Sequence, residues 1–426
     1  MNVPLRRNAD LAQALAQASR VLRRVLAGHS QSGQREATRN TDSRAAVTDL
    51  VYGALRRFGR DDAALRALSA RGQIDPDLRA LLLVSIAALE SGRYADHTVV
   101  DQAVRACARL RMPRVQGFAN AILRAYLRER VRLAPIIEAS PEARYQHPNW
   151  WIQRVREAYP DTWVEVLEAG NRHPPMCLRV NRRRCDPEEY LARLATHAIA
   201  ARRVGNSALL LHKPVPVGQL PGFAQGDVSV QDAGAQRAAE LMELSSGQRV
   251  LDACAAPGGK AAHILELADV ELTALDIDPE RCSMISQNLS RLGMHAEVRA
   301  ADCTLPGNWW DGRAYDRILA DVPCSASGIA RRRPDVKWLR RESDLAGFAA
   351  RQSAIVSALW QTLAPGGKLL YVTCSIFPEE NGAVVEAFLA RTPGAGRGQL
   401  VAGAPAQLTP DGGQDGFFFA ILEKAC

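Results

Sequence analysis

The amino-acid sequence predicts three consecutive parts: an all-helical N-terminal third, a small α+β segment, and a doubly wound α/β domain with a mostly parallel sheet. Through roughly the first 134 residues, apolar side chains recur at three- and four-residue spacings, the period of helices with one buried face. Prolines then interrupt the chain, and from 236 onward short apolar strands alternate with helices, which is typical of a parallel α/β sheet. We place the domains at 1–140, 141–236 and 237–426.

The helical part is expected to form a compact bundle, because its helices are joined by short loops. Helices are expected at 8–27, 43–57, 60–69, 76–89, 96–110 and 114–131. The longest apolar stretch, Ala80–Leu89, contains Ser85 and is far too short for a membrane span. It therefore predicts a buried core helix. We also expect no signal peptide, because the first ten residues are polar.

Positive charge is concentrated at the N-terminal end. Residues 1–140 hold 23 Lys and Arg against 13 Asp and Glu, residues 141–240 hold 13 against 11, and residues 241–426 hold 18 against 22, which accounts for the net charge of +8. A basic module joined to a slightly acidic one indicates that polyanion binding and chemistry are divided between them. An arginine-rich composition without any such role explains the same numbers.

The nine cysteines fit reduced thiols in a cytoplasmic protein. Their number is odd and no C-x-x-C or Cys/His cluster has zinc spacing, so neither a disulfide framework nor a metal site is expected.

The middle segment is predicted to contain strands at Met176–Asn181 and Ala208–His212 with a helix at 186–196 between them. The positive charge of this segment suits contact with a polyanion backbone. It carries six arginines: Arg179, Arg182, Arg183, Arg184, Arg202 and Arg203.

The C-terminal domain is predicted to contain six strands and three helices. The strands are expected at Val250–Ala253, Leu272–Ile277, Glu297–Ala301, Arg317–Asp321, Lys368–Thr373 and Gly416–Leu422, and the helices at 258–267, 279–292 and 343–364. The Gly- and Pro-rich stretch 392–416 is expected to be a loop.

A loop of small residues follows the first of these strands, reading Asp252-Ala-Cys-Ala-Ala-Pro-Gly-Gly-Lys260. Small residues between a strand and a helix let a ligand approach the backbone closely. The loop is neither a G-x-G-x-x-G dinucleotide motif nor a P-loop, because Ala261 follows Lys260 where a P-loop has Ser or Thr. It therefore predicts a different nucleoside-like cofactor.

Four aspartates end successive strands: Asp252, Asp276, Asp302 and Asp321. For a single Asp, a helix N-cap or turn role would be the preferred interpretation. Four acids at the carboxyl ends of parallel strands converge instead on the crevice where such sheets bind ligands. Acids there can hold a ribose, an adenine edge and a cationic ammonium, the groups of S-adenosylmethionine.

Two cysteines also follow strand ends, Cys324 in D-V-P-C-S and Cys374 in V-T-C-S. A lone free cysteine is more often an inert core residue than a nucleophile. Methylation of cytosine at C5 needs a thiolate, since its addition at C6 makes C5 nucleophilic. The positions alone allow either cysteine to be the attacking group.

The motifs together resemble those of the RNA cytosine-C5 methyltransferases, in particular the bacterial 16S ribosomal RNA enzymes of the Sun/Fmu/RsmB type. They are D-A-C-A-A-P-G-G-K, A-L-D-I-D, A-D-C, A-D-V-P-C-S-A-S-G, G-I-A-R-R-R-P-D-V-K-W and Y-V-T-C-S-I-F-P-E-E-N. Y-G-A-L-R-R and G-F-A-N-A-I-L-R of the N-terminal part resemble the NusB-like RNA-binding domain of those enzymes. The resemblance implies a Rossmann-like class I methyltransferase domain.

The resemblance also implies roles for individual residues. The cofactor, S-adenosylmethionine, would be lined by Cys254, Ala255, Ala256, Pro257, Gly258, Gly259 and Lys260, with Asp276 on its ribose, Asp302 near its adenine and Asp321 by its methionyl end and the cytosine. Cys374 would be the nucleophile, and Cys324 would assist product release. One departure is Ala261-Ala262, where larger or hydroxylated residues are expected.

The expected substrate is 16S rRNA, with the target cytosine unstacked from its neighbours. The loop carrying Arg331, Arg332 and Arg333 is expected to contact phosphates, although a solvated surface run is the alternative interpretation. We expect a monomer with no membrane or metal partner.

Two alternatives stay open. The same chemistry could act on transfer RNA or large-subunit rRNA. A protein of another class, a non-catalytic RNA-binding assembly or antitermination factor, would retain the fold as a scaffold, but the pair of cysteines and the four strand-end acids argue against it.

Overall fold

The computed structural model describes residues 10–29, 41–69, 72–400 and 404–426. The chain forms two compact units, Met1–Arg172 with Ala330–Glu342, and His173–Ile329 with Ser343–Cys426. The chain thus leaves the second unit after Ile329, contributes thirteen residues to the first, and returns at Ser343.

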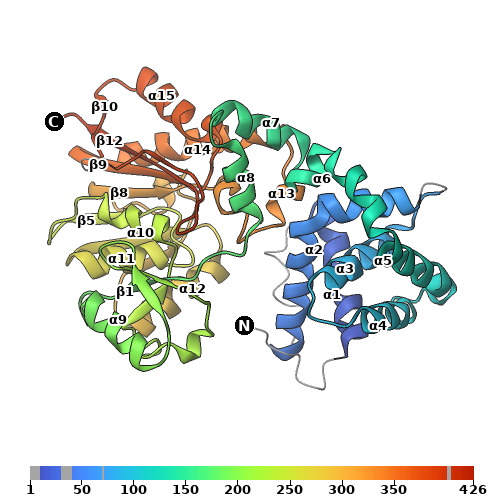
Figure 1. Ribbon diagram of the computed structural model, residues 1–426. Coiled ribbons are helices and arrows are strands. Elements are labelled where there is room, and N and C mark those ends of the chain that lie inside the picture. Colours follow the sequence, from blue (N-terminus) through green and yellow to red (C-terminus); the bar gives the residue numbers. More distant parts are fainter. Residues whose placement is uncertain (1–9, 30–40, 70–71, 401–403) are drawn as a thin grey trace. The chain divides into compact units, whose positions relative to one another are not determined.

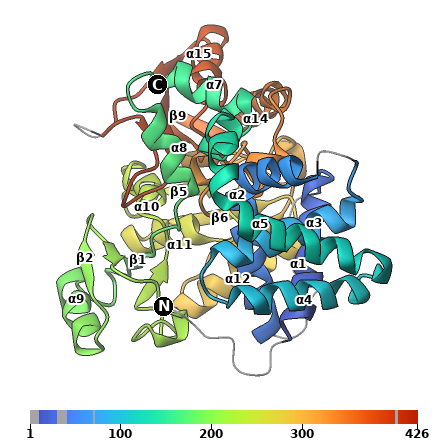
Figure 2. The same cartoon turned by 45° about the vertical axis from the view of Figure 1, so that its right-hand side comes forward.

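The first unit is all helical, as the sequence predicts (Figure 2). Its helices are α1 (Leu11–Leu26), α2 (Thr41–Leu68), α3 (Pro76–Glu90), α4 (Asp96–Arg109), α5 (Gln116–Glu138), α6 (Pro141–Tyr145), α7 (Asn149–Ala158), α8 (Trp163–Asn171) and the short α13 (Val336–Leu339). Helix α3 is the core helix expected from its apolar stretch, since every residue of Ala80–Leu89 is buried. Inside it, the hydroxyl of Ser85 donates to the carbonyl of Leu81 at 2.7 Å.

Two expected boundaries in this unit are wrong. Helix α2 is continuous where helices at 43–57 and 60–69 were expected, and α5 continues past 131 and through Pro135. Gly59 lies inside α2. A glycine is needed at this position because a Cβ there would stand 2.4 Å from the carbonyl oxygen of Glu142. That glycine therefore marks a close helix crossing and not a break. Residues 8 and 9 of the first expected helix lie outside the described residues.

A buried carboxyl group makes the stability of this unit dependent on pH. Asp61 is 1% exposed, and its Oδ1 accepts a hydrogen bond from Arg57 Nη2 at 3.0 Å. Burial raises the pKa of Asp61 to about 7, more than the neighbouring Arg57 lowers it. Native Asp61 thus keeps its proton up to about pH 7, whereas the unfolded chain releases it near pH 4. The native state accordingly loses stability as the pH rises through that window.

We expect Asp61→Asn to stabilise the helical unit, because asparagine keeps the acceptor for Arg57 without the buried charge. The gain should grow as the pH rises from 5 to 7, level off above 7, and reach on the order of 2 kcal/mol. Urea unfolding of both proteins between pH 5 and 8 measures it. Asp49→Asn, at a carboxylate that is 39% exposed, is the control, and a gain that is the same at every pH would contradict the prediction.

The second unit begins at His173, and its first part is a small α+β segment. Four short strands form an antiparallel sheet in the order β2-β3-β1-β4, built from β1 (Cys177–Val180), β2 (Ala201–Arg203), β3 (Ala208–Leu211) and β4 (Val228–Val230). Helix α9 (Pro187–Thr196) lies between β1 and β2 in the chain and buries Tyr190 and Leu194 in the core of this segment.

The rest of the unit is a doubly wound sheet in the order β10-β12-β9-β8-β5-β6-β7 (Figure 1). Its strands are β5 (Arg249–Asp252), β6 (Glu271–Asp276), β7 (Glu297–Ala300), β8 (Tyr315–Asp321), β9 (Leu363–Thr373), β10 (Ala395–Arg397) and β12 (Phe417–Lys424). The central strands pair in parallel, and β12 pairs antiparallel with β9. The expected loop at 392–416 is wrong in part, since it contains β10 and also β11 (Gln407–Leu408), which pairs with β12.

Helices cover both faces of this sheet. Helices α10 (Ala233–Glu240), α11 (Gly259–Leu267) and α12 (Pro279–Leu292) pack on one face, and α14 (Asp344–Thr362) and α15 (Gly382–Arg391) pack on the other. Successive strand residues alternate between the two cores: Val250 and Leu251 of β5 face opposite sides, as do Leu370 and Tyr371 of β9. Both faces are buried, which explains why the strands read as continuous apolar runs.

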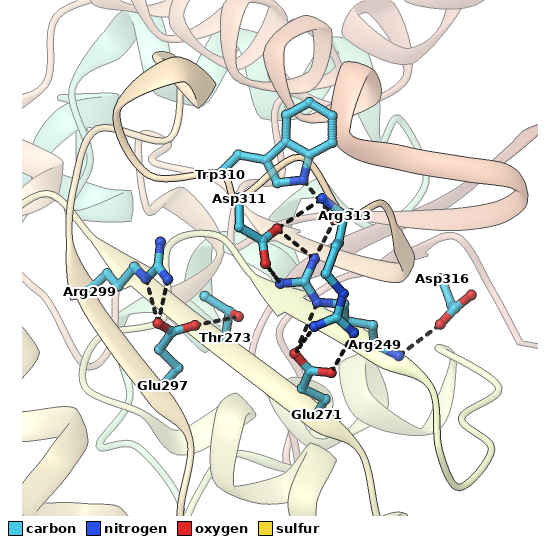
Figure 3. A network of polar contacts seen from close by, with 9 residues as sticks. All are labelled: Arg249, Glu271, Thr273, Glu297, Arg299, Trp310, Asp311, Arg313 and Asp316. Atoms are coloured by element: carbon cyan, nitrogen blue, oxygen red, sulfur yellow. Dashed lines mark hydrogen bonds and ion pairs between the residues drawn. The ribbon is translucent and has the colours of Figure 1, made fainter.

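Ion pairs connect the amino ends of β5 and β6 (Figure 3). The guanidinium of Arg249, 8% exposed, makes a bidentate pair with Asp311 at 2.6 and 3.0 Å and also contacts Glu271 at 3.1 Å. It lies over the ring of Tyr315, 4.5 Å from the centroid. This network lies at the amino ends of the strands, opposite the carboxyl ends. It therefore stabilises the end of the sheet that is far from the predicted ligand site.

Candidate active site

The carboxyl ends of the strands gather the residues that the sequence singled out. The chain passes from β5 to β6 and β7 on one side and then crosses to β8 on the other. The crevice between β5 and β8 is therefore the topological switch point, where open α/β sheets bind ligands. Asp252 ends β5 and Asp321 ends β8, so both carboxylates lie at this crevice.

The loop after β5 has the shape that its glycines permit. Gly258 has φ +93°, the left-handed region that favours glycine. A Cβ there would also stand 3.1 Å from Cα of Ile285 in α12. At Gly259, the first residue of α11, a Cβ would meet only Gln231 Nε2 at 3.8 Å. The start of this helix is thus open, with space for a ligand beside the backbone.

A fully buried arginine holds this loop in place. Arg179 of β1 is 0% exposed and donates to both carboxylate oxygens of Glu266 in α11, at 2.6 and 2.7 Å. It also donates to the Gly259 carbonyl at 2.6 Å and to Gln231 Oε1 at 2.5 Å. Arg179 is therefore a structural residue, away from the surface where an RNA contact would need it.

Asp276 is the last residue of β6, and Asp302 lies just after the end of β7. Asp276 is 3% exposed and accepts hydrogen bonds from the backbone N–H groups of Ala256 and Asp278 and from Arg281 Nη1, at 3.1–3.3 Å. One carboxylate oxygen of Asp302 accepts from the N–H and the hydroxyl of Thr304, at 2.9 and 2.7 Å. Both side chains are thereby fixed in direction, as ligand-binding groups need to be.

An ion pair joins the loop to β8. Lys260 Nζ lies 2.6 Å from Asp321 Oδ2, and the two side chains are 15% and 27% exposed. Burial opposes the charge on Lys260, but Asp321 and Asp252 together outweigh it, and the pKa of Lys260 is raised. Beneath this pair, burial and the charge of Asp321 raise the pKa of Asp252 to about 7. A buried acid and an ion pair thus share the switch point.

The two cysteines of the sequence analysis meet at the same edge. Cys324 follows β8, Cys374 follows β9, and their Sγ atoms lie 3.2 Å apart. Cys324 is 9% exposed, whereas Cys374 is half-buried and more accessible. The hydrogen bond to Cys374, together with burial, raises the pKa of the Cys324 thiol well above its usual value. One thiol is thus held protonated beside a second that solvent can reach.

Sequence reasoning assigned no role to Glu380 or to Cys303, which contact residues at the carboxyl ends of the strands. Glu380 is fully buried and accepts from the N–H of Ser325 at 2.7 Å and from the hydroxyl of Ser375 at 2.6 Å. Cys254 shares a hydrogen bond with Cys303 of the A-D-C motif, and this bond and burial raise the pKa of Cys254 well above its usual value. The P-E-E-N letters after T-C-S were the only signal for Glu380.

The three arginines after the P-C motif belong to the helical unit and differ in exposure. Arg331 is 1% exposed, and its carbonyl accepts from Arg56 Nη2 at 3.0 Å. Arg332 and Arg333 are half-buried. Farther along the same segment, Trp338 Nε1 donates to the Leu55 carbonyl at 2.8 Å. Only Arg332 and Arg333 therefore have side chains accessible to a partner.

The described residues contain no group of three or more His, Cys, Asp or Glu arranged to hold a metal ion. None of the described helices is long and apolar enough to cross a membrane.

The strand order with an antiparallel β12, the small-residue loop and the acids at the switch point define a Rossmann-like domain of the class I methyltransferase type. Family models agree with this architecture. The 16S rRNA methyltransferase RsmB/F model matches residues 239–423, a ferredoxin-like domain model of the same proteins matches 147–218, and the NusB family model matches 10–128.

Similar proteins extend over nearly the whole chain. Ribosomal RNA small subunit methyltransferase B of Vibrio cholerae is 40% identical over 96% of each chain. The crystal structure of the protein PH0851 superposes with a TM-score of 0.77 at 23% identity, covering 96% of this chain and 99% of the other. A methyltransferase homologue from Pyrococcus horikoshii has a TM-score of 0.60 at 26% identity, covering 67% and 99%. The chain belongs to the RsmB/F family of ribosomal RNA methyltransferases.

Proposed function

We propose that the protein transfers a methyl group from S-adenosylmethionine to C5 of a cytosine in 16S rRNA through a covalent adduct between cysteine and C6. The pair of cysteine sulfurs, 3.2 Å apart at the carboxyl ends of neighbouring strands β8 and β9, is the observation that carries this proposal. Methylation of an exocyclic amine or a hydroxyl needs no thiol, whereas attack at C6 of a pyrimidine does.

The residues around the switch point fit S-adenosylmethionine. The open backbone at Gly259 and the small side chains from Cys254 to Gly258 leave room beside the start of α11. Asp276 would hold the ribose hydroxyls, Asp302 would lie near the adenine, and Asp321 would face the cationic methionyl end. When bound, the cofactor supplies an electrophilic methyl group, and the acids suit its positive charges.

The two thiols divide the remaining work. The Cys374 thiol loses its proton to water, and its Sγ forms a bond to C6, which makes C5 nucleophilic. After methylation of C5, the C5 proton passes to water, the C5–C6 double bond re-forms and the C6–Sγ bond breaks, which releases Cys374 as a thiolate. Cys374 is the more accessible thiol, which suits the attacking role. Cys324 remains protonated beside it and is placed to return a proton to the departing sulfur.

RNA contacts are expected on both units. The target cytosine must leave its stack to reach the crevice, which favours a loop or incompletely folded RNA. Arg332 and Arg333 are the accessible arginines near the catalytic motif in the chain, and the NusB-like helical unit adds positive charge. Binding through phosphates should weaken as salt increases. We expect a monomer that acts in the cytoplasm on ribosomal RNA.

The substrate is tested with methyl-labelled S-adenosylmethionine and RNA from a strain that lacks the gene. We expect label in 16S rRNA, recovered as 5-methylcytidine after nuclease digestion. Bisulfite sequencing of that strain should show one cytosine that has lost protection. Label in transfer RNA or large-subunit rRNA in place of 16S rRNA would contradict the substrate assignment, and no label in any RNA would contradict the enzymatic one.

We expect Asp276→Ala to weaken cofactor binding, because it removes the acceptor for the ribose and releases the Ala256 backbone. The dissociation constant for S-adenosylhomocysteine should rise about 10- to 100-fold, the cost of losing hydrogen bonds to a charged group. Isothermal titration calorimetry measures it, with Asp269→Ala, at a carboxylate 81% exposed, as the control. Equal affinities for Asp276→Ala and the unchanged protein would remove Asp276 from the cofactor site.

A further inference from the structure

The buried carboxylate of Glu380 connects the two loops that carry the cysteines. Glu380 ends the short 3₁₀ helix Pro378–Glu380, six residues after Cys374, and is 0% exposed. Its Oε1 accepts from the backbone N–H of Ser325, the residue after Cys324, at 2.7 Å. Its Oε2 accepts from the hydroxyl of Ser375, the residue after Cys374, at 2.6 Å. One side chain thus bonds the neighbour of each sulfur.

Direct hydrogen bonds also join the two loops. The hydroxyls of Ser325, Ser327 and Ser375 lie within 3.0–3.3 Å of one another. The N–H of Gly328 donates to the Cys374 carbonyl at 2.9 Å, and the N–H of Ile376 donates to the Ser327 hydroxyl at 2.9 Å. The two loops are therefore joined by hydrogen bonds of their own, and Glu380 bonds one residue of each.

The backbone of the first loop is held in an unfavourable conformation. Ala326, two residues after Cys324, has φ +62°, a region that non-glycine residues rarely adopt. Such a conformation persists only where the surrounding contacts impose it. The bond from Ser325 N–H to Glu380 is one of those contacts.

The described residues contain no ion pair to Glu380; its oxygens accept from a backbone N–H, a hydroxyl and Gln352 Nε2, the last at 3.2 Å. Burying a carboxylate with neutral donors alone is costly. The stability of the fold therefore does not explain why a carboxylate is buried here. Its position between the two cysteine loops suggests a role in positioning them.

We propose that Glu380 is a positioning residue that sets the separation of the two cysteine sulfurs by bonding the residue that follows each of them. This inference rests on the proposed function for its catalytic meaning, but the separation of the sulfurs can be tested without RNA. With its second carboxylate oxygen on Ser375, the side chain keeps Cys374 in line with Cys324 while the base is attacked and released.

The geometric test measures how fast the two thiols join under oxidation. Diamide oxidises two thiols to a disulfide and is itself reduced to the hydrazine, and peptide mapping identifies the Cys324–Cys374 product. In Glu380→Ala the bridge is missing, and formation of this disulfide should slow about tenfold. Glu380→Gln keeps the length of the side chain and should stay within about threefold of the unchanged protein. Glu386→Gln, at a carboxylate 63% exposed on α15, is the matched control.

The catalytic test follows single-turnover methyl transfer to 16S rRNA. Glu380→Ala should be about 100-fold slower, the cost of a reacting group misplaced by roughly 1 Å. Glu380→Gln should recover most of the rate. Affinity for S-adenosylhomocysteine should change less than about threefold in both, since Glu380 bonds the cysteine loops and not the cofactor loop.

The outcomes separate the possibilities. A folded Glu380→Ala that forms the disulfide at the original rate would overturn the proposal. If that variant does not fold, Glu380→Asp replaces it: its carboxylate is one methylene shorter and cannot reach both loops, so an original rate there would overturn the proposal equally. If the unchanged protein methylates no RNA, the proposed function fails, and the rate of disulfide formation still decides the role of Glu380.

Discussion

Replacing Cys374 by alanine should abolish methyl transfer to RNA, a loss of about four orders of magnitude or more, as expected for removal of a covalent nucleophile. Without Sγ, C6 of the cytosine has no group to add, and C5 stays unreactive toward the methyl donor. Transfer of tritiated methyl groups to RNA from a strain lacking the gene measures the loss. Binding of S-adenosylhomocysteine should be unchanged, which separates lost chemistry from lost structure.

Replacing Cys324 by alanine should instead trap the reaction at the covalent stage. The Cys374 adduct would still form, but the thiol that lies 3.2 Å from it would be missing when the sulfur departs. A denaturant-stable protein–RNA complex should then accumulate, visible as a retarded band in a denaturing gel. Cys426→Ala, at an exposed cysteine, is the control. A trapped complex in Cys374→Ala but not in Cys324→Ala would exchange the two roles.

Replacing Arg179 by alanine should cost about 3–5 kcal/mol in the free energy of unfolding, because the carboxylate of Glu266 would be left buried without its partner. That side chain is 2% exposed, and Arg179 bonds both of its oxygens. Urea unfolding at pH 7 measures the loss. Affinity for S-adenosylhomocysteine should fall as well, since Arg179 also bonds the Gly259 carbonyl beside Lys260.

A neighbouring arginine provides the control for this prediction. Arg183 pairs with Asp269 at 2.7 Å, but the two side chains are 41% and 81% exposed. Solvent screens such a pair, and Arg183→Ala should cost about 1 kcal/mol or less. If the two variants lose the same stability, burial is not what makes the Arg179 contact strong.

The architecture was predictable because it depends on the local spacing of apolar residues along the chain. Helical spacing in the first third and strand–helix alternation in the last third gave the two kinds of unit, and the turn from each strand into its loop marked Asp276 and Asp321. The errors fall where a distant contact overrides a local signal. Two helices were expected at 43–57 and 60–69, yet α2 is continuous, and its crossing with α6 requires a glycine at position 59.

Burial is what the sequence could not assign. Arg179 and Arg331 read as charged residues in basic stretches, and both have buried side chains. Glu380 reads as one of two acids in P-E-E-N, and only the folded chain brings it against residue 325, 55 positions away. Arg332 and Arg333 follow Arg331 directly but are only half-buried, so neighbouring residues of one charged run can differ in exposure.

The sequence by itself determined the class of fold and singled out the small-residue loop, the strand-end acids and the two cysteines, because each of these depends on residues close together in the chain. The tertiary structure alone decided which groups meet. It brought Cys324 and Cys374 to 3.2 Å across 50 residues and Arg179 onto Glu266 across 87. The physical reason is that parallel strands align their carboxyl ends, so the order of strands in the sheet, and not their order in the chain, selects the partners.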